Sequence, residues 1–133
     1  MAFLLDTNIA IHLRDLDDVV TGRVAALPAR PLMSIVTSLE LENGVVRVPA
    51  WKLFRRMRVD ALNDELPVLE FGPAELAEYR RIVEAVGYSR PRILDRMIAA
   101  TALVHRLTVI TMNGADFSDV PGLTLEVWES PAA

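Results

Sequence analysis

Short apolar runs alternate along the chain with longer segments in which apolar residues recur every three to four positions. The short runs predict buried strands, and the longer periodic segments predict amphipathic helices. Proline and glycine mark several boundaries, since Pro49 ends one helix, Pro73 begins another and Gly87 follows its end. The predicted strands are residues 3–5, 32–36, 67–71, 107–110 and 123–128. The predicted helices are residues 7–14, 18–27, 37–47, 51–62, 73–86 and 92–105.

Strands that alternate with helices predict an α/β fold with a mostly parallel central sheet. We expect residues 1–133 to form a single domain, because a chain of 133 residues without repeats or linkers falls within the usual size of one domain, about 100–150 residues. Ligand sites in such sheets lie beyond the carboxyl ends of the strands. Residues that follow strands, or that begin the helices between them, are therefore the candidates for chemistry.

Four acidic residues from four separate segments are predicted to meet at that edge of the sheet. Asp6 follows the first strand and Asp116 lies shortly after the fourth, whereas Glu40 and Asp95 lie near the starts of helices that begin at the same edge. Carboxylates this close repel one another, and a divalent cation such as Mg²⁺, which prefers oxygen ligands, would remove the repulsion. The arrangement suits hydrolysis of a phosphodiester by a metal-activated water. Polar residues expected to orient these groups are Thr7, Asn8, Ser34, Thr37, Thr111 and Asn113.

Each acidic residue also has an ordinary structural interpretation. Asp6 and Asp95 suit the N-termini of helices. Glu40 matches a capping box with Thr37, and Asp116 suits an Asx-turn. Four independent caps need not gather at one sheet edge, so the set favours a common site. The other acidic residues, which include Asp15, Asp17, Asp18, Glu42 and Glu75, are expected on the surface.

Short motifs occur in order at residues 4–8 (LLDTN), 34–41 (SIVTSLEL) with Gly44, 95–102 (DRMIAATA), 107–113 (LTVITMN), 116–117 and 120–123. Together they resemble the PIN-domain ribonucleases, and more narrowly the VapC toxins of bacterial type II toxin–antitoxin pairs. The resemblance covers nearly the whole chain. It implies a PIN-like three-layer α/β/α fold with a mostly parallel central sheet.

The resemblance also implies a Mg²⁺- or Mn²⁺-dependent endoribonuclease that cleaves structured, tRNA-like RNA and thereby inhibits translation. Relatives of this kind are held inactive by a VapB-type antitoxin and assemble as homodimers or as toxin–antitoxin hetero-oligomers. The catalytic and metal-binding carboxylates that it implies are Asp6, Glu40, Asp95 and Asp116. The supporting polar positions that it implies are Thr7, Asn8, Thr111 and Asn113.

A stretch without carboxylates, residues 43–59, carries five positive charges together with Trp51 and Phe54. Three interpretations stay open for it: a solvated helix face, a grip on RNA phosphates, or a surface that binds the antitoxin. A second basic group lies beside Asp95 and includes Arg96, where many relatives have an apolar residue. A guanidinium there would either pair with the carboxylates or contact phosphate. The candidate RNA contacts are Arg55, Arg56, Arg92 and Arg96.

Composition narrows the chemistry further. The chain has no cysteine, which excludes disulfides, thiolate zinc sites and cysteine nucleophiles. Its two histidines, His12 and His105, lie on separate helices and are interpreted as structural, so metal-free acid–base cleavage is disfavoured. A net charge of −4 argues by itself against a protein that coats nucleic acid. This charge is, however, equal to that of the four clustered carboxylates, so the rest of the chain is balanced. The lack of a long apolar run or a signal peptide predicts a cytoplasmic protein without membrane contact.

Two other enzyme classes fit less well. A phosphoacceptor receiver domain needs an acidic pair at the first strand and a late lysine, whereas Lys52, the only lysine, lies in the middle of the chain. A phosphatase of the haloacid dehalogenase type needs a second aspartate where Asn8 stands. The remaining alternative is a catalytically inert PIN-like module that binds protein or RNA, and the intact set of four carboxylates argues against it.

Overall fold

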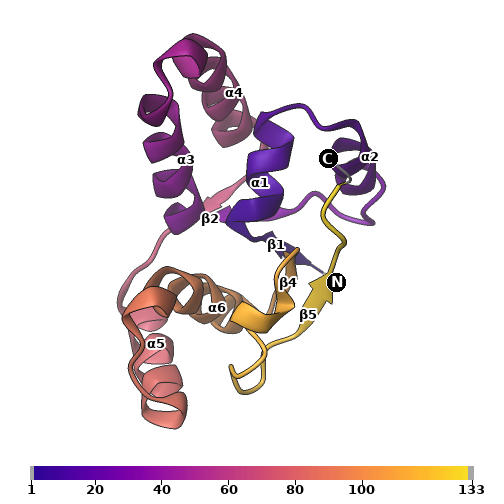
Figure 1. Cartoon of the computed structure of the whole chain (residues 1–133). Coiled ribbons are helices and arrows are strands. Elements are labelled where there is room, and N and C mark those ends of the chain that lie inside the picture. The colour runs from indigo at the N-terminus through magenta and orange to yellow at the C-terminus, as the bar shows by residue number, and fades with distance from the viewer. Residues whose placement is uncertain (1, 132–133) are drawn as a thin grey trace.

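The central sheet is parallel throughout the part of the chain that the computed structural model describes, residues 2–131. Residues 1, 132 and 133 of the predicted domain lie outside the described residues. The five strands follow the order β3-β2-β1-β4-β5, and the all-buried β1 occupies the centre (Figure 1). Leu4 of β1 pairs with Leu32 on one side and Val109 on the other. The strands are β1 (Phe3–Leu5), β2 (Leu32–Ser34), β3 (Val68–Leu69), β4 (Thr108–Thr111) and β5 (Leu125–Val127).

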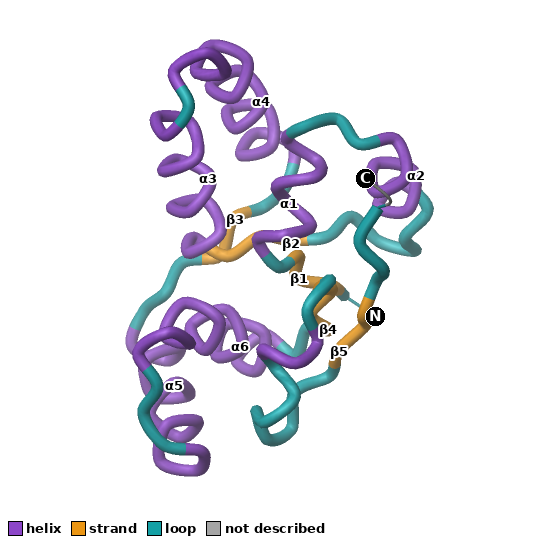
Figure 2. Tube along the Cα trace, in the orientation of Figure 1, coloured by secondary structure: helices purple, strands orange, loops and turns teal. Residues whose placement is uncertain are grey.

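Helices cover both faces of the sheet, which confirms the predicted three-layer α/β/α arrangement (Figures 1 and 2). Successive residues of a strand point to opposite faces, so Leu5 packs into the core under α1 to α4, whereas Leu4 packs into the core under α5 and α6. No helix within residues 2–131 has the length and apolar character needed to cross a membrane. The helices are α1 (Thr7–Arg14), α2 (Asp18–Ala25), α3 (Ile35–Arg47), α4 (Lys52–Glu65), α5 (Pro73–Val86) and α6 (Ile93–His105). Short 3₁₀ turns occupy Pro49–Trp51, Arg90–Arg92 and Gly114–Asp116.

Helix α3 begins two residues earlier than the sequence predicts. Ser34 ends β2, and its side chain accepts the Val36 backbone N–H at 3.0 Å, which makes it the N-cap of α3. The predicted strand over residues 32–36 is confirmed for residues 32–34, but its end was wrong: β-branched Ile35 and Val36 favour strands in general, whereas the serine cap decides the local structure. Glu40 therefore lies in the second turn of α3, and the capping box with Thr37 does not form.

Glu75 is the second departure from the sequence-based expectations. It was expected on the surface, but its side chain is 8% exposed. One carboxylate oxygen accepts the Gly72 backbone N–H at 2.7 Å and so caps the start of α5. The other oxygen lies 3.6 Å from Nε2 of His105, at the end of α6. Glu75 thus helps to hold these two antiparallel helices together.

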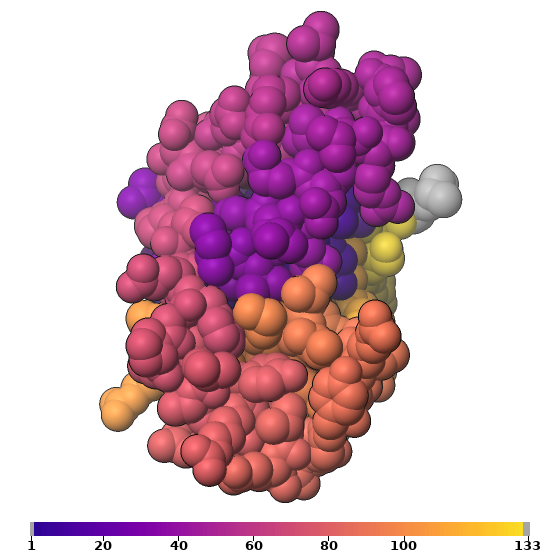
Figure 3. Space-filling model, turned by 90° about the vertical axis from the view of Figure 1, so that its left-hand side faces the viewer, coloured from indigo at the N-terminus to yellow at the C-terminus, as the bar shows by residue number. Residues whose placement is uncertain are grey.

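The start of α6 lies against α3 on one side of the molecule. Figure 3 views this side, with the purple atoms of α3 directly above the orange atoms at the beginning of α6. Because α1, α3 and α6 all begin at the carboxyl edge of the sheet, their first turns come together there.

Candidate metal centre

Asp6 lies where the central strand β1 passes into α1. Its side chain is 6% exposed, and both carboxylate oxygens are engaged. Oδ1 accepts the Thr7 backbone N–H at 2.7 Å, which caps α1, and Oδ2 accepts the Thr111 hydroxyl of β4 at 2.7 Å. The aspartate is therefore both an N-cap and part of a cross-strand contact between β1 and β4.

Thr7 connects α1 to Glu40 on α3. Its hydroxyl donates to Oε1 of Glu40 at 2.7 Å and lies 3.0 Å from the hydroxyl of Thr37. A threonine hydroxyl carries a single hydrogen, so Thr37 is the donor in the second contact. Thr37 is fully buried, as expected of a residue that orients other groups rather than one that contacts solvent.

Thr111 and Asn113 position Asp116. The Thr111 oxygen accepts the Asn113 backbone N–H at 3.0 Å and the Asn8 side-chain amide at 3.4 Å. Asn113 in turn donates its side-chain amide to Oδ2 of Asp116 at 2.8 Å. Each of the four predicted supporting residues thus contacts a carboxylate or a group that holds one. Ser34, which was expected in the wider set of orienting polar residues, caps α3 instead.

Asp95 lies in the first turn of α6 and completes the cluster electrostatically. The pKa of Asp95 is raised from 3.8 to about 7, mainly by burial and further by repulsion from Asp6, Asp116 and Glu40, while Arg92 opposes the increase. Burial also raises the pKa of Asp6; hydrogen bonds from Thr111 and Thr7 oppose that increase, and repulsion by Glu40 and Asp116 adds to it. The structure therefore brings all four predicted carboxylates into one electrostatic site.

The chemistry of these donors fits a hard divalent cation. Within residues 2–131, no three histidine or acidic side chains form a ready-made cage for a metal ion. Mg²⁺ does not need such a cage, because it usually binds through one or two carboxylates and keeps several waters. The four carboxylates repel one another, and a bound cation would relieve this repulsion. Oxygen donors alone favour Mg²⁺ or Mn²⁺ over softer metals.

Of the arginines near Asp95, Arg96 does not lie as predicted. Arg96 is 3% exposed and donates to the Gly87 carbonyl at 2.5 Å and to Oδ2 of Asp119 at 3.4 Å. Its expected contact with the carboxylates or with phosphate was wrong, because the side chain turns into the protein. Arg92 lies nearer the site and donates to the Ala115 carbonyl at 3.2 Å. Asp119, the partner of Arg96, carries no sequence motif that would have identified it.

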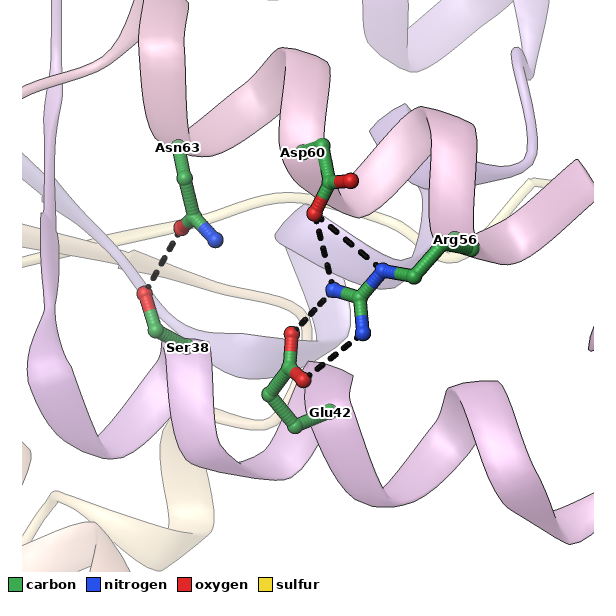
Figure 4. A network of polar contacts seen from close by, with 5 residues as sticks. All are labelled: Ser38, Glu42, Arg56, Asp60 and Asn63. Atoms are coloured by element: carbon green, nitrogen blue, oxygen red, sulfur yellow. Dashed lines mark hydrogen bonds and ion pairs between the residues drawn. The ribbon is translucent and has the colours of Figure 1, made fainter.

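The basic stretch on α4 is largely engaged in contacts within the protein. Arg56 lies between Glu42 of α3 and Asp60 of α4 and bonds to both, next to a contact between Ser38 and Asn63 (Figure 4). Arg55 donates to the Gly44 carbonyl at 2.8 Å. Arg58 donates to backbone carbonyls at the end of α1. These contacts favour a structural role for the three arginines, which join α4 to its neighbours.

The chain matches the family model described as "PIN domain" over residues 3–123. This protein belongs to the PIN domain family. The match includes strands β1 to β4 and all four carboxylates, and it ends shortly before β5. It confirms the family that the sequence motifs indicated.

The relatives of this chain include proteins named VapC and VapBC. Ribonuclease VapC1 from Rickettsia felis is 29% identical to this chain, and the match covers 92% of the chain and 93% of the relative. The structure of VapBC2 from the same organism, bound to a DNA fragment from its promoter, superposes with a TM-score of 0.85 at 24% identity, covering 97% of this chain and all of the other. DNA-bound VapBC from Salmonella typhimurium superposes with a TM-score of 0.81 at 25% identity, with 96% and 98% of the two chains covered. The relatives named VapC and VapBC agree with the resemblance that the sequence motifs indicated, and the family model confirms the PIN domain itself.

Proposed function

We propose that this PIN domain protein is a divalent-metal-dependent endoribonuclease that acts in the cytoplasm as the toxin of a type II toxin–antitoxin pair. One observation carries the proposal: carboxylates from four separate segments lie close enough at the carboxyl edge of the sheet to repel one another, and this repulsion helps to raise the pKa values of Asp95 and Asp6. A bound cation would neutralise the repulsion. The four residues are Asp6, Glu40, Asp95 and Asp116. The similarity to Ribonuclease VapC1 over nearly the full length supports RNA as the substrate.

The four carboxylates would hold Mg²⁺, or Mn²⁺ in its place. When bound, the cation supplies polarisation of the scissile phosphate and lowers the pKa of an attacking water. Thr111 and the Thr7 backbone fix the two oxygens of Asp6, so this ligand needs little reorganisation. Asp95 must release a proton to bind the cation near neutral pH, which makes metal affinity fall as the medium becomes acidic.

The supporting residues would keep the other carboxylates in place during the reaction. Thr7 donates to one oxygen of Glu40, which leaves the second oxygen for the cation or for water. Asn113 donates to Oδ2 of Asp116 and so fixes the side chain in a similar way. Attack by water in line with the leaving 3′ oxygen would leave a 5′-phosphate on the product. The proposed substrate is structured, tRNA-like RNA, and its cleavage would inhibit translation.

A VapB-type antitoxin is the proposed inhibitor, since several similar structures are VapBC complexes. The tip formed by α3 and α4 offers a surface for it. Trp51, Leu53 and Met57 are 54%, 83% and 71% exposed there, next to a hollow of about 400 Å³ that Phe54 and Arg55 help to line. An amphipathic helix could bury these apolar side chains. The assembly would be a homodimer or a toxin–antitoxin hetero-oligomer.

The substitution Asp6→Asn tests the proposed enzyme. Asparagine caps a helix about as well as aspartate, so α1 and the fold should persist. We expect RNA cleavage to fall by at least about 100-fold, because a metal ligand is lost, and growth arrest on expression to disappear. Binding of the antitoxin should remain.

The matched control is Asp64→Asn, which removes an exposed carboxylate from α4 and should preserve both cleavage and growth arrest. Growth arrest that survived Asp6→Asn would contradict the proposal and favour an inert module that acts by binding alone.

A further inference from the structure

The loop that carries Asp116 is tied to the residues around Asp95 from two sides. On the first side, Arg92 lies three residues before Asp95 and donates Nη1 to the carbonyl of Ala115 at 3.2 Å. Ala115 directly precedes Asp116 within the 3₁₀ turn Gly114–Asp116. This bond therefore joins the start of α6 to the backbone just before the second carboxylate.

On the second side, Arg96 directly follows Asp95 and pairs through Nη2 with Oδ2 of Asp119 at 3.4 Å. Asp119 lies three residues after Asp116. Nη1 of the same guanidinium donates to the carbonyl of Gly87, where the connection from α5 to α6 begins. Arg96 thus holds the start of α6 to the segments before and after it.

The burial of Arg96 is hard to explain by stability alone. Its side chain is 3% exposed, and within the described residues its Nε has no hydrogen-bond partner. A guanidinium taken out of water is costly, and apolar residues of similar volume often give equal or greater stability. The residue is better explained by the geometry that it imposes, because each of its two bonds reaches a different segment.

We propose that Arg92 and Arg96 are positioning residues that fix the loop of residues 113–119 against the first turn of α6. Asp95 and Asp116 would then keep the separation that a shared divalent cation requires. Asn113 orients the Asp116 side chain within its own loop, but it does not fix that loop relative to α6. The inference rests on the proposed function, and it gives both arginines a role inside the protein instead of a contact with RNA.

Titration of Mn²⁺ into the RNA-free protein, followed by calorimetry, tests this inference. Arg96→Met and Asp119→Asn should each weaken Mn²⁺ binding by about 10-fold, the size of effect usual for residues that support metal ligands. The double variant should lose little more than either single variant, because both remove the same ion pair. Asp119→Asn changes a side chain that is 42% exposed, so it should leave the fold intact even if Arg96→Met does not.

The matched control is Arg80→Met, which removes an exposed guanidinium from α5 and should leave the Mn²⁺ dissociation constant unchanged. An unchanged dissociation constant in folded Asp119→Asn and Arg96→Met would overturn the inference, as would an equal weakening in the control. Since the readout needs no RNA, a wild-type protein that binds Mn²⁺ but fails to cleave RNA would contradict the proposed function and not this inference.

Discussion

Thr7 and Thr111 each hold two parts of the candidate metal centre in place. The Thr111 hydroxyl donates to Asp6, and its oxygen accepts the Asn113 backbone N–H. The Thr7 hydroxyl reaches Glu40 on another helix. These bonds offset part of the cost of burying carboxylates, but burial, together with repulsion by the neighbouring carboxylates, still raises the pKa of Asp95 from 3.8 to about 7. The site is therefore a source of instability until a cation enters.

The substitution Asp95→Asn tests this statement through the pH dependence of stability. The pKa of Asp95 is about 7 in the folded protein against 3.8 as its ordinary value, so the folded state binds the extra proton between these pH values. Stability of the metal-free protein should therefore fall as pH rises from about 4 to 7. The uncharged variant escapes this loss and should be more stable than the wild type at pH 8 by about 1–2 kcal/mol, allowing for screening by water.

Thermal unfolding in EDTA at pH 5 and pH 8 measures the effect. The advantage of Asp95→Asn should be larger at pH 8, and added Mg²⁺ should raise the melting temperature of the wild type more than that of the variant. Asp64→Asn, on the exposed face of α4, serves as the control. An advantage of equal size at both pH values would contradict the electrostatic account of the site.

At the scale of elements, α3 is placed by close packing against α1. A Cβ added at Gly44 would lie 2.7 Å from Nη1 of Arg14, whose side chain is 6% exposed and is held by a bidentate pair with Asp15. The Gly44 carbonyl also accepts a bond from Arg55 of α4. This glycine therefore sets how closely three helices approach, and Glu40 lies one turn before it on α3.

We expect Gly44→Ala to destabilise the protein by about 1 kcal/mol. In an open helix the same change would stabilise by about 0.5–1 kcal/mol, but here the pinned Arg14 must move. Gly22→Ala in α2 provides the comparison, since a Cβ there meets nothing within 4 Å. Chemical denaturation of both variants measures the difference. A stabilising effect at Gly44 as large as that at Gly22 would show that the packing is loose.

The boundaries of elements were predictable where a local signal sets them. Pro73 and Gly87 bracket α5, and the observed helix, Pro73–Val86, has the predicted bounds. The all-buried β1 and the helix after it also lie where predicted. The start of α3 was not predicted because two local signals disagree: Ser34 favours the start of a helix, whereas the β-branched residues after it favour a strand. Tertiary packing decides between the two, and a single sequence does not reveal that packing.

Contacts between distant residues were the part that sequence could not supply. The four carboxylates were predictable because the topology of a parallel sheet brings strand ends and helix starts to one edge. The partners of the arginines were not, since Arg56 pairs with Glu42 across two helices and Arg96 pairs with Asp119 across a loop. Charge runs look alike in sequence whether they face solvent, RNA or another helix.

At the scale of the whole molecule, the net negative charge can be traced to the candidate site. The net charge of −4 has the same size as the charge of the four clustered carboxylates, so acidic and basic residues balance elsewhere in the chain. An RNA phosphate that approaches the site meets concentrated negative charge unless a cation neutralises it. The overall acidity therefore does not oppose an RNA substrate, but it makes the cation a condition for the encounter.

The most direct test of the central claim is to incubate the purified protein, free of any partner, with structured RNA and to determine the ends of the fragments. The account predicts cleavage in Mg²⁺, none in excess EDTA, and fragments that carry 5′-phosphates. Cleavage that persisted in EDTA, or fragments that ended in 2′,3′-cyclic phosphates, would contradict it.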